Sequence, residues 1–542
     1  MYCDTPQVNQ LVTLMKAHDI HDVVVCPGSR NATIVHDLHE AAEAFSLHPV
    51  TDERSAAFVA LGVSLATQSP AAVCVTSGSA LLACIPAVAE ACYRNIPLLV
   101  ISADRPPQWI GQLDGQTLQQ VGALAPYCQT FSLQIPYDAE SAWHNNRQIN
   151  EALLTLRRRG GTPVHINVPI AEPMFSFRTP QLPSERVVRE VRPVVSQVLP
   201  DEVVRQIAAA RLPALIIGQY ERGDLRKEIA DLERHSQLWV LPEILSDVRG
   251  SFRMNVFDRI SETEQKEYLP DVIVQIGGNF VHKRFKQILR RTDCRVIRVG
   301  EDCGLYDTFC HLTTWVSAPA QPVLAQLAAE LPFHKGVKKA SDEIDALCKT
   351  EKAALCSALS YTEVLTLQTS VGMLHRSLQH FQESYTLHLA NSSAVRAAQC
   401  YFESGDAPVF CNRGVNGIEG SLSVAVGYAL KMWGLCFVVI GDLSFFYDAN
   451  ALWNTRLPRN LRVLLLNNGH GGIFDHLPGL SVSPACDEFI AAGKQHFSAE
   501  GIAEAYHLGY YAAHTPAELR QALTDWQQTS ERAQLIEVFL PA

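Results

Sequence analysis

The sequence predicts an α/β protein of three doubly wound domains, each with a mostly parallel central sheet. Three observations support this fold class. At 542 residues the chain is too long for one hydrophobic core and suits about three domains. Short apolar runs alternate with segments of helical periodicity, which is typical of parallel sheets covered by helices. Several of these runs end in a polar or glycine-rich turn.

The first predicted domain covers residues 1–174. Its strands are expected to end in the turns Pro27-Gly28-Ser29-Arg30, Thr76-Ser77-Gly78-Ser79 and Ala103-Asp104-Arg105-Pro106. Ligands of doubly wound sheets bind beyond the carboxyl ends of the strands, so these turns are candidates for a binding site. The expected strands lie at 22–26, 72–75, 97–101 and 164–168.

A proline-containing stretch at 175–200 predicts a linker to a second domain at 201–331. A second connection is predicted at 332–355, and a third domain at 356–542. The alternation of strand and helix continues in both domains. The expected strands are 214–218, 272–277 and 295–299 in the second domain, and 409–410, 436–440, 462–466 and 534–539 in the third.

The stretch 55–89 contains no charged residue and is longer than a membrane span requires. It is interrupted by Gln68-Ser69-Pro70, by the polar loop 76–79 and by Pro86. We therefore expect a buried helix, a strand at 71–75 and a second buried helix, rather than a membrane helix.

Charge and cysteine usage exclude several classes of function. A net charge of −11 and a pI near 5.9 argue against binding of nucleic acid. The sequence contains neither a basic run nor a basic amphipathic helix, so it gives no indication of binding to a membrane surface. The 15 cysteines form no Cys-x-x-Cys pair, and no secretory signal precedes them. We expect reduced thiols and a cytoplasmic location.

The third domain carries the most informative motif. Gly441-Asp442-Leu443-Ser444 follows one apolar run, and Asn468-Gly469-His470-Gly471-Gly472 follows another. The 26 positions between Asp442 and Asn468 suit one strand–helix–strand unit, so both residues should reach the same sheet edge. A carboxylate, an amide and a glycine-rich loop suit a hard cation that also binds phosphate oxygens. Gly-Asp after a strand is also common as a plain strand-to-helix turn.

This pattern resembles the diphosphate-anchoring motif of thiamine-diphosphate (ThDP) enzymes, and the whole chain resembles one family of them. That family is the 2-succinyl-5-enolpyruvyl-6-hydroxy-3-cyclohexene-1-carboxylate (SEPHCHC) synthases, which have the ThDP-enzyme fold. The resemblance spans all three predicted domains. The matching motifs are Pro27-Gly28-Ser29-Arg30, Asp52-Glu53-Arg54, Ala103-Asp104-Arg105-Pro106-Pro107, Lys283-Arg284, Asn391-Ser392 with Arg396, Asn412-Arg413-Gly414, Gly417-Ile418, and Gly441-Asp442-Leu443-Ser444 with Tyr447-Asp448.

The resemblance implies a transferase of menaquinone biosynthesis. Its reaction is the ThDP-dependent decarboxylation of 2-oxoglutarate and the addition of the resulting succinyl carbanion to isochorismate, which gives SEPHCHC and CO₂. The implied cofactors are ThDP and Mg²⁺ or Mn²⁺. The first domain would bind the pyrimidine ring, and the third the diphosphate and the metal. The implied assembly is a homodimer or homotetramer with active sites at the subunit interface.

The resemblance also implies the cofactor residues. Glu53 would be the catalytic acid–base group at the aminopyrimidine ring; the alternative is a helix N-terminal carboxylate stabilised by the dipole. Ile418 would support the bent cofactor, and Ile473 and Phe474 would form an apolar wall beside it; plain core packing is the alternative. The metal ligands would be Asp442, Asn468 and the backbone carbonyl of His470. The remaining cofactor contacts would be Ser392, Gly441, Leu443 and Ser444.

Both implied substrates are dianions, so their site requires fixed cations. Arginine suits this role because its planar fork binds carboxylates at two points. By similarity, Arg396 and Arg413 bind 2-oxoglutarate, and Leu477 belongs to the apolar wall. The isochorismate side would be formed by Ser29, Arg30, Arg105, Gln116, Lys283 and Arg284. For any one of these cations, a surface ion pair is the alternative.

Two other functions stay open at this point. Another ThDP-dependent 2-oxoacid decarboxylase or carboligase, such as an acetohydroxyacid-synthase-like enzyme, would take a small monoanion and would not need the additional cations. A catalytically silent ThDP-fold regulatory subunit is the third possibility, although Glu53 and Asp442 are both present.

Overall fold

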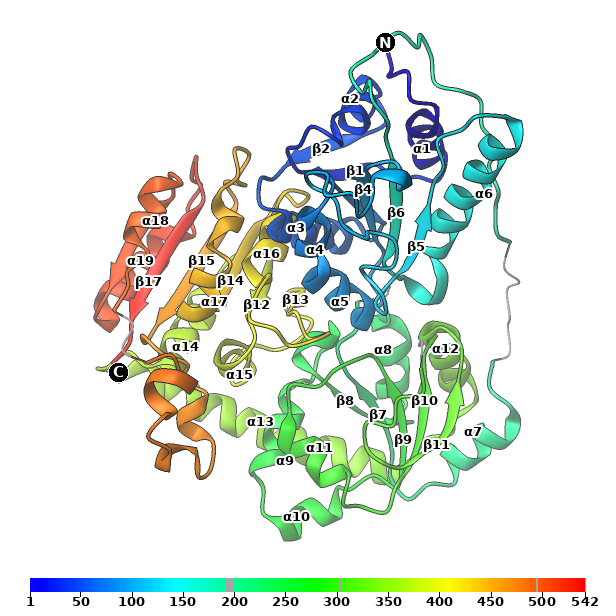
Figure 1. Cartoon of the computed structure of the whole chain (residues 1–542). Coiled ribbons are helices and arrows are strands. Elements are labelled where there is room, and N and C mark those ends of the chain that lie inside the picture. The colour runs from blue at the N-terminus through cyan, green and yellow to red at the C-terminus, as the bar shows by residue number, and fades with distance from the viewer. Residues whose placement is uncertain (192–197, 222, 302–303, 494–495, 542) are drawn as a thin grey trace.

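The computed structural model describes residues 1–191, 198–221, 223–301, 304–493 and 496–541. Within these ranges the strands form three sheets, and every strand pair is parallel. Helices cover the faces of the sheets, as Figure 1 shows. The predicted fold class is therefore confirmed, and the sheets are wholly rather than mostly parallel.

The first sheet has the strand order β2-β1-β3-β4-β6-β5. Helix α3 begins at Glu53 because the side chain of Asp52 caps it, accepting from the backbone N–H groups of Arg54 and Ser55. The strands are β1 (Asp22–Val25), β2 (Ser46–Pro49), β3 (Ala71–Val75), β4 (Leu98–Asp104), β5 (Gln129–Ser132) and β6 (Val164–Pro169). The helices are α1 (Pro6–Ala17), α2 (Ala32–Glu40), α3 (Glu53–Thr67), α4 (Ser79–Ala83), α5 (Ile85–Arg94) and α6 (Ala139–Thr155).

The uncharged stretch 55–89 folds as predicted, into most of α3, the strand β3, the short α4 and the first half of α5. Most of its apolar side chains are buried, whereas Leu82 is 41% exposed. In the part of the chain that the structure describes, no helix combines the length and the apolar character that a membrane span needs.

The second sheet has the order β11-β10-β9-β7-β8. The predicted linker 175–200 leads into it, with 192–197 outside the described residues. The strands are β7 (Pro213–Ile217), β8 (Trp239–Pro242), β9 (Val272–Ile276), β10 (Arg295–Val299) and β11 (Leu312–Val316). The helices are α7 (Asp201–Ala208), α8 (Arg226–Arg234), α9 (Phe252–Arg259), α10 (Glu262–Glu267), α11 (Lys283–Leu289) and α12 (Ala320–Glu330).

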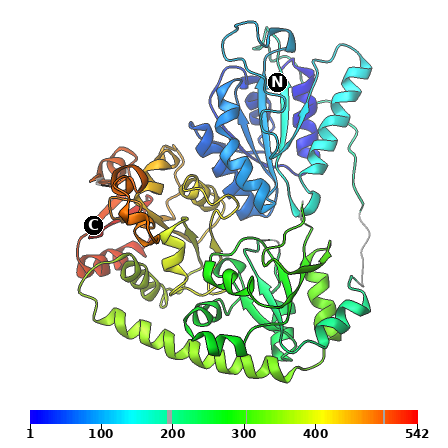
Figure 2. The ribbon, with the colours of Figure 1, turned by 60° about the horizontal axis from the view of Figure 1, so that its bottom comes forward.

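The stretch 332–355, predicted as a second connection, is mostly helical. It forms most of α13 (Lys335–Ser360), which Figure 2 shows as a long helix running from the second sheet towards the third. Val337, Ala340 and Ile344 of α13 are buried in the core of the second sheet. This connection therefore contributes to the hydrophobic core, which an extended linker would not do.

The third sheet has the order β13-β12-β14-β15-β17-β16. The strands are β12 (Tyr385–Leu389), β13 (Val409–Phe410), β14 (Leu435–Gly441), β15 (Leu461–Asn467), β16 (Gly509–Ala513) and β17 (Gln534–Phe539). The helices are α14 (Leu367–Leu378), α15 (Ser393–Ala398), α16 (Ser421–Ala429), α17 (Asp442–Tyr447), α18 (Glu500–Ala505) and α19 (Pro516–Trp526).

The first and third sheets are joined by direct packing of α3 on α16. A Cβ atom added to Gly62 would lie 2.1 Å from the carbonyl oxygen of Val424, and one added to Gly427 would lie 2.0 Å from that of Val59. The two backbones are therefore in contact, which only glycine permits at these positions. Because one hydrophobic cluster includes both helices, the start of α3 is fixed relative to the third sheet.

Candidate active site

Asp442 and Asn468 lie at the same edge of the third sheet. Strands β14 and β15 are neighbours, with Gly441 beside Leu466 in register, and the two residues follow their strands. The carboxylate of Asp442 is buried and accepts the backbone N–H of Leu443 at 2.8 Å and that of Gly469 at 2.7 Å. It thereby holds the two strand-end loops together, as the spacing of the motif predicts.

The donor atoms at this edge suit a hard cation. Asn468 Nδ2 lies 3.0 Å from Nδ1 of His470, whereas the amide oxygen makes no hydrogen bond among the described residues. The imidazole of His470 also contacts Asp475 through Nε2, at 2.7 Å. Burial lowers the pKa of His470, but the bond to Asp475, the bond to the backbone of Asn468 and the charges of Asp475 and Asp442 together outweigh burial, so the net pKa is raised. The ring is thus engaged within its loop, and the backbone carbonyl of His470, which accepts the N–H of Gly472 at 3.0 Å, retains a second lone pair for an ion.

No cluster of three or more His, Cys, Asp or Glu side chains is present within the described ranges. A metal at this edge would therefore be held by one carboxylate, one amide oxygen and one backbone carbonyl. Mg²⁺ prefers oxygen ligands in this number because its other positions are taken by water or phosphate oxygens. The residues present fit a diphosphate-bound Mg²⁺ or Mn²⁺.

The loop before α16 lies beside this edge. The hydroxyl of Ser444 donates to the carbonyl of Ile418, which joins the loop to α17. The amide of Asn391 donates to the carbonyls of Asn412 at 2.5 Å and Gly417 at 2.7 Å. These bonds fix the backbone around Ile418, whose side chain is 38% exposed although it is large and apolar. An apolar group held at the surface by fixed backbone suits contact with a cofactor.

Glu53 lies in the first turn of α3 and is half-buried. Its two neighbours contact the third sheet's helices: Asp52 accepts from Asn450 Nδ2 at 2.7 Å, and Arg54 donates to the carbonyl of Tyr447 at 2.7 Å. By contrast, the Glu53 carboxylate makes no hydrogen bond or ion pair within the described part of the chain. The neighbours thus anchor the helix start, and the carboxylate of Glu53 stays available for a ligand.

Arg30 and Arg105 form one cationic group at the carboxyl edge of the first sheet. The Arg30 guanidinium is buried and donates to the carbonyl of Ile170 at 2.9 Å and to Glu172 at 3.4 Å. Arg105 lies 3.9 Å from Glu172 and 3.3 Å from Asp114. Burial, and then the charge of Arg105, lower the pKa of Arg30. Because two positively charged arginines lie close together here, this edge is suited to binding an anion.

Ser29 and Gln116, the other residues of the first domain predicted to bind isochorismate, are positioned near Arg30 and Arg105 by the local backbone. Ser29 precedes Arg30 and is exposed. Gln116 has a positive φ of 55°, and its backbone lies 3.3 Å from the position of a Cβ on Gly78. Gln116 is thus held against the turn that follows β3, at the same sheet edge.

A second cationic group lies where the second and third sheets approach each other. Burial lowers the pKa of Arg396, and the nearby charge of Arg413 lowers it further. Burial, then the charge of Arg290 and then that of Arg413 lower the pKa of Lys286. Lys283 adds to the effect on Lys286, and Lys283 and Arg284 are exposed in the first turn of α11. Sequence reasoning missed Lys286, although it lies three residues after Lys283 on the same helix.

The two cationic groups are not joined to each other. Arg30 and Arg105 belong to the first domain, whereas Arg396 and Arg413 belong to the third and Lys283, Arg284 and Lys286 to the second. The sequence-based expectation of one isochorismate site containing Arg30, Arg105, Lys283 and Arg284 therefore requires residues of two different regions.

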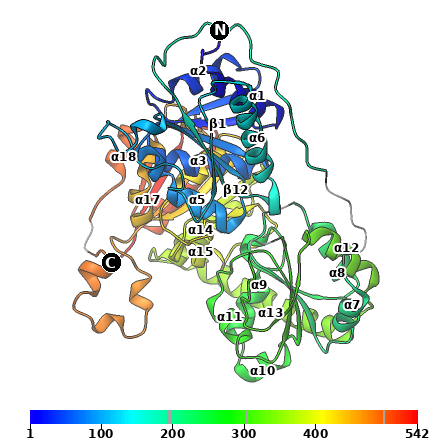
Figure 3. The same cartoon turned by 45° about the vertical axis from the view of Figure 1, so that its right-hand side comes forward.

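Ile473, Phe474 and Leu477 follow the Asn468 loop. The first two are half-buried, whereas Leu477 is 42% exposed. A Cβ on Gly471 would lie 2.9 Å from the Phe474 ring, so the ring packs on the loop. Figure 3 shows the segment after β15, in orange, standing away from the third sheet. The predicted apolar wall is therefore open on one side in a single chain.

Ser392 is the remaining predicted cofactor contact. It lies at the start of α15 with a positive φ of 71°, and its carbonyl accepts from Arg396 Nη1 at 2.8 Å. A positive φ is costly for a residue with a side chain and persists only where the surroundings impose it. Arg396 thus stabilises the turn that carries Ser392.

Comparisons with known proteins agree with this geometry. Residues 8–123 match the thiamine pyrophosphate enzyme, N-terminal TPP binding domain. The chain is 40% identical to the 2-succinyl-5-enolpyruvyl-6-hydroxy-3-cyclohexene-1-carboxylate synthase of Phocaeicola vulgatus, over 99% of this chain and 96% of that protein. It is 40% identical to the synthase of the same name from Bacteroides thetaiotaomicron, with the same coverage of both chains. The identity to that of Bacteroides fragilis is 39%, over 99% and 97%.

Proposed function

The chain belongs to the 2-succinyl-5-enolpyruvyl-6-hydroxy-3-cyclohexene-1-carboxylate (SEPHCHC) synthase family, and we propose that it forms SEPHCHC and CO₂ from 2-oxoglutarate and isochorismate. It is a ThDP-dependent enzyme of menaquinone biosynthesis. Two observations together carry the proposal. The chain is 40% identical to family members over 99% of its length, and it has two groups of fixed cations, which suit two dianionic substrates.

The cofactor assignment rests on two regions of the chain. Glu53 would hold a proton at the aminopyrimidine ring, and Ile418 would support the bend of the cofactor. Asp442, Asn468 and the carbonyl of His470 would hold Mg²⁺ or Mn²⁺ on the diphosphate. When bound, ThDP supplies the electron sink that decarboxylation of a 2-oxoacid needs. We assign the pyrimidine side to residues 1–174, the diphosphate side to 356–542, and a separate central domain to 201–331.

The substrate assignment follows the two cationic groups. Arg396 and Arg413 would bind 2-oxoglutarate, beside the loop that carries Ile418. Arg30 and Arg105, with Ser29 and Gln116, would bind isochorismate together with Lys283 and Arg284. From the family resemblance, we infer that the complete site forms between two copies in a homodimer or homotetramer. The open apolar wall at Leu477 is consistent with a second copy.

The alternative ThDP-dependent carboligase of a small monoanionic oxoacid is less compatible with this site. It would leave the buried Arg30 and the partly exposed Arg105 with Glu172 and Asp114 as their anionic partners and no anionic substrate, and two like charges in proximity are costly. A silent regulatory subunit would not need the unpaired carboxylate of Glu53.

Substrate turnover tests the proposal directly. The purified protein with ThDP, Mg²⁺ and 2-oxoglutarate should release CO₂, and added isochorismate should be consumed in equal amount. A rate of CO₂ release that does not change when isochorismate is added would indicate a different acceptor. Absence of release with any 2-oxoacid, despite metal-dependent ThDP binding, would support the silent subunit.

Arg413→Ala and Arg396→Ala should each raise the KM for 2-oxoglutarate by about 10- to 100-fold, because each removes a charge-assisted hydrogen bond to a carboxylate. The KM for isochorismate should change by no more than about twofold. Initial rates with one substrate varied at saturation of the other measure both values. Arg459→Ala is the matched control, since it removes an exposed arginine paired with Glu531 in the same domain. Unchanged 2-oxoglutarate kinetics would remove these two residues from the assignment.

A further inference from the structure

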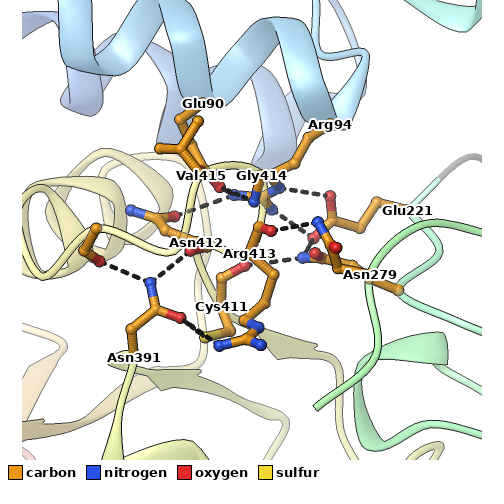
Figure 4. Close-up of polar contacts among 12 residues, drawn as sticks. Glu90, Arg94, Glu221, Asn279, Asn391, Cys411, Asn412, Arg413, Gly414 and Val415 are labelled. Carbon is orange, nitrogen blue, oxygen red and sulfur yellow. Dashed lines mark hydrogen bonds and ion pairs between the residues drawn. The ribbon is translucent and has the colours of Figure 1, made fainter. Parts of the chain in front are cut away.

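Glu90 is a buried carboxylate that no motif predicts. It lies on α5, its side chain is almost fully enclosed, and it faces the loop before α16 from the first domain. Oε1 accepts the backbone N–H of Gly414 at 2.9 Å, and Oε2 accepts that of Val415 at 2.8 Å (Figure 4). One carboxylate therefore binds two successive backbone N–H groups of a loop more than 300 residues away in the sequence.

A buried arginine compensates the charge of Glu90. Arg94, one helical turn further along α5, lies 3.4 Å from Glu90 and donates to Asn412 Oδ1 at 3.0 Å. Its other nitrogens contact Glu221, which follows β7 in the second domain. The ion pair thus stands where all three domains meet, and it is directed at the same loop.

Side chains of the other two domains hold the preceding residues of this loop. Gln219 donates to the carbonyl of Cys411 at 2.8 Å, and Asn279 donates to the carbonyl of Arg413. Asn391 donates to the carbonyl of Asn412 at 2.5 Å. Backbone groups from Cys411 to Val415 are consequently bound by side chains from all three domains, as Figure 4 shows.

The side chain that this loop presents is Arg413. Its Nη1 donates to Asn391 Oδ1 at 3.0 Å, and the residue is buried. Its Nε is also buried and has no hydrogen-bond partner within the described residues. An arginine with one nitrogen fixed and an unpaired buried donor is oriented for a carboxylate that the chain itself does not supply.

The fit between Glu90 and the loop is close. A Cβ on Gly414 would lie 2.7 Å from the carbonyl oxygen of Glu90 and 2.8 Å from its Oε2. Glycine at 414 and glutamate at 90 are therefore matched, because any side chain at 414 would displace the carboxylate from the backbone N–H groups.

We propose that Glu90 is a positioning residue, which fixes the backbone of Gly414 and Val415 and thereby orients Arg413 towards the carboxylate of 2-oxoglutarate. The proposal rests on the function proposed above. Glu90 touches neither substrate nor cofactor and acts through Arg413 alone, so its loss should affect one substrate selectively.

Glu90→Gln tests this role. The variant keeps the volume but places an amide NH₂ against one of the two backbone N–H groups, so one of these hydrogen bonds is lost. We expect the KM for 2-oxoglutarate to rise about tenfold, with the KM for isochorismate within about twofold of wild type. Hydrogen–deuterium exchange of the peptide that contains Gly414 and Val415 should also become faster in the variant.

Glu221→Gln is the matched control. It removes the same charge from the other side of Arg94 but leaves the N–H groups of Gly414 and Val415 bound to Glu90. Its 2-oxoglutarate KM and its exchange rate in this peptide should stay within about twofold of wild type. Equal effects of the two variants would mean that the charge of Arg94, and not the hold on the loop, matters, and would overturn the proposal.

Gly414→Ala perturbs the same contact from the loop and keeps the test decisive if Glu90→Gln does not fold. It should reproduce the selective rise in the 2-oxoglutarate KM. Equal rises in both KM values, or none, would overturn the positioning role while wild-type turnover still supports the proposed function. If wild type does not use 2-oxoglutarate, the proposed function fails, and an unchanged exchange rate in Glu90→Gln would separately refute the hold on the loop.

Discussion

Replacing Glu53 by glutamine is expected to lower kcat by about a thousandfold while the Kd for ThDP stays within about threefold of wild type. General acid–base catalysis by a positioned side chain contributes about 10²- to 10⁴-fold, and an amide can neither give nor take the proton. Glutamine is nearly isosteric with glutamate and can still accept or donate a hydrogen bond, so cofactor binding should survive. Steady-state turnover and a ThDP titration in Mg²⁺ measure the two effects.

The structure singles out Glu53 within its acidic and basic neighbours. Asp52 is committed to the helix cap and to Asn450, and Arg54 is committed to Tyr447. Of these three side chains, only that of Glu53 makes no hydrogen bond or ion pair with the described residues. Since α3 is fixed against α16 by the contact at Gly62, the backbone that carries Glu53 has a defined position relative to the third sheet.

The competing explanation is that Glu53 only stabilises the N-terminus of α3 through the helix dipole. Glu140→Gln is the matched control, because Glu140 also lies in the first turn of a helix of the first domain, after a capping aspartate. Both variants should lose the same small amount of helix stability, and only Glu53→Gln should lose turnover. Near-normal turnover in Glu53→Gln would assign this residue to the dipole alone.

Most strands could be predicted because interior strands of a parallel sheet are continuous apolar runs. The strands that were missed are mainly at the sheet edges, namely β2, β5, β8, β11 and β16. Edge strands have one neighbour, so polar residues are tolerated there, as in Ser46-Leu47-His48-Pro49 of β2. This reason does not apply to β8, which is a short buried apolar run, Trp239-Val240-Leu241-Pro242. The interior strand β12 was missed because Thr386 and His388 interrupt its apolar pattern, and His388 is instead stacked on Phe410.

The site was predictable where it depends on strand ends. The adjacency of Asp442 and Asn468 follows from one strand–helix–strand unit, and the structure confirms it. Contacts between distant segments leave no local pattern in the sequence. In the sequence, Glu90 looks like an ordinary residue of an amphipathic helix, because its bond to Gly414 forms only when the domains pack. For the same reason, the sequence could not place Lys283 and Arg284 relative to Arg30 and Arg105.

Asp442→Asn is expected to weaken metal-dependent ThDP binding by about a hundredfold or more. Loss of a hydrogen-bonding partner behind a metal ligand already costs about 10- to 100-fold in affinity, and loss of a charged ligand should cost at least as much. Without a cation, burial raises the pKa of Asp442, although the N–H groups of Leu443 and Gly469 oppose this. A bound Mg²⁺ would favour the ionised form, and asparagine cannot supply that charge.

Titration of ThDP at several Mg²⁺ concentrations, followed by protein fluorescence, measures this effect. In wild type, EDTA should abolish binding, and Mg²⁺ or Mn²⁺ should restore it. Asparagine retains one oxygen for Gly469 or Leu443, so the loops should stay folded, which thermal unfolding can verify.

Asp448→Asn provides the control for burying an amide in place of a carboxylate at this end of the third sheet. Asp448 ends α17, is fully buried, and accepts from the hydroxyl and backbone N–H of Ser423 at 2.7 and 2.8 Å. Burial raises the pKa of Asp448 to about 6, so its charge is costly rather than useful near neutral pH. Its replacement should therefore leave the Mg²⁺ dependence of ThDP binding unchanged. If both variants, or neither, lose this dependence, Asp442 is not the ligand that joins the metal to the protein.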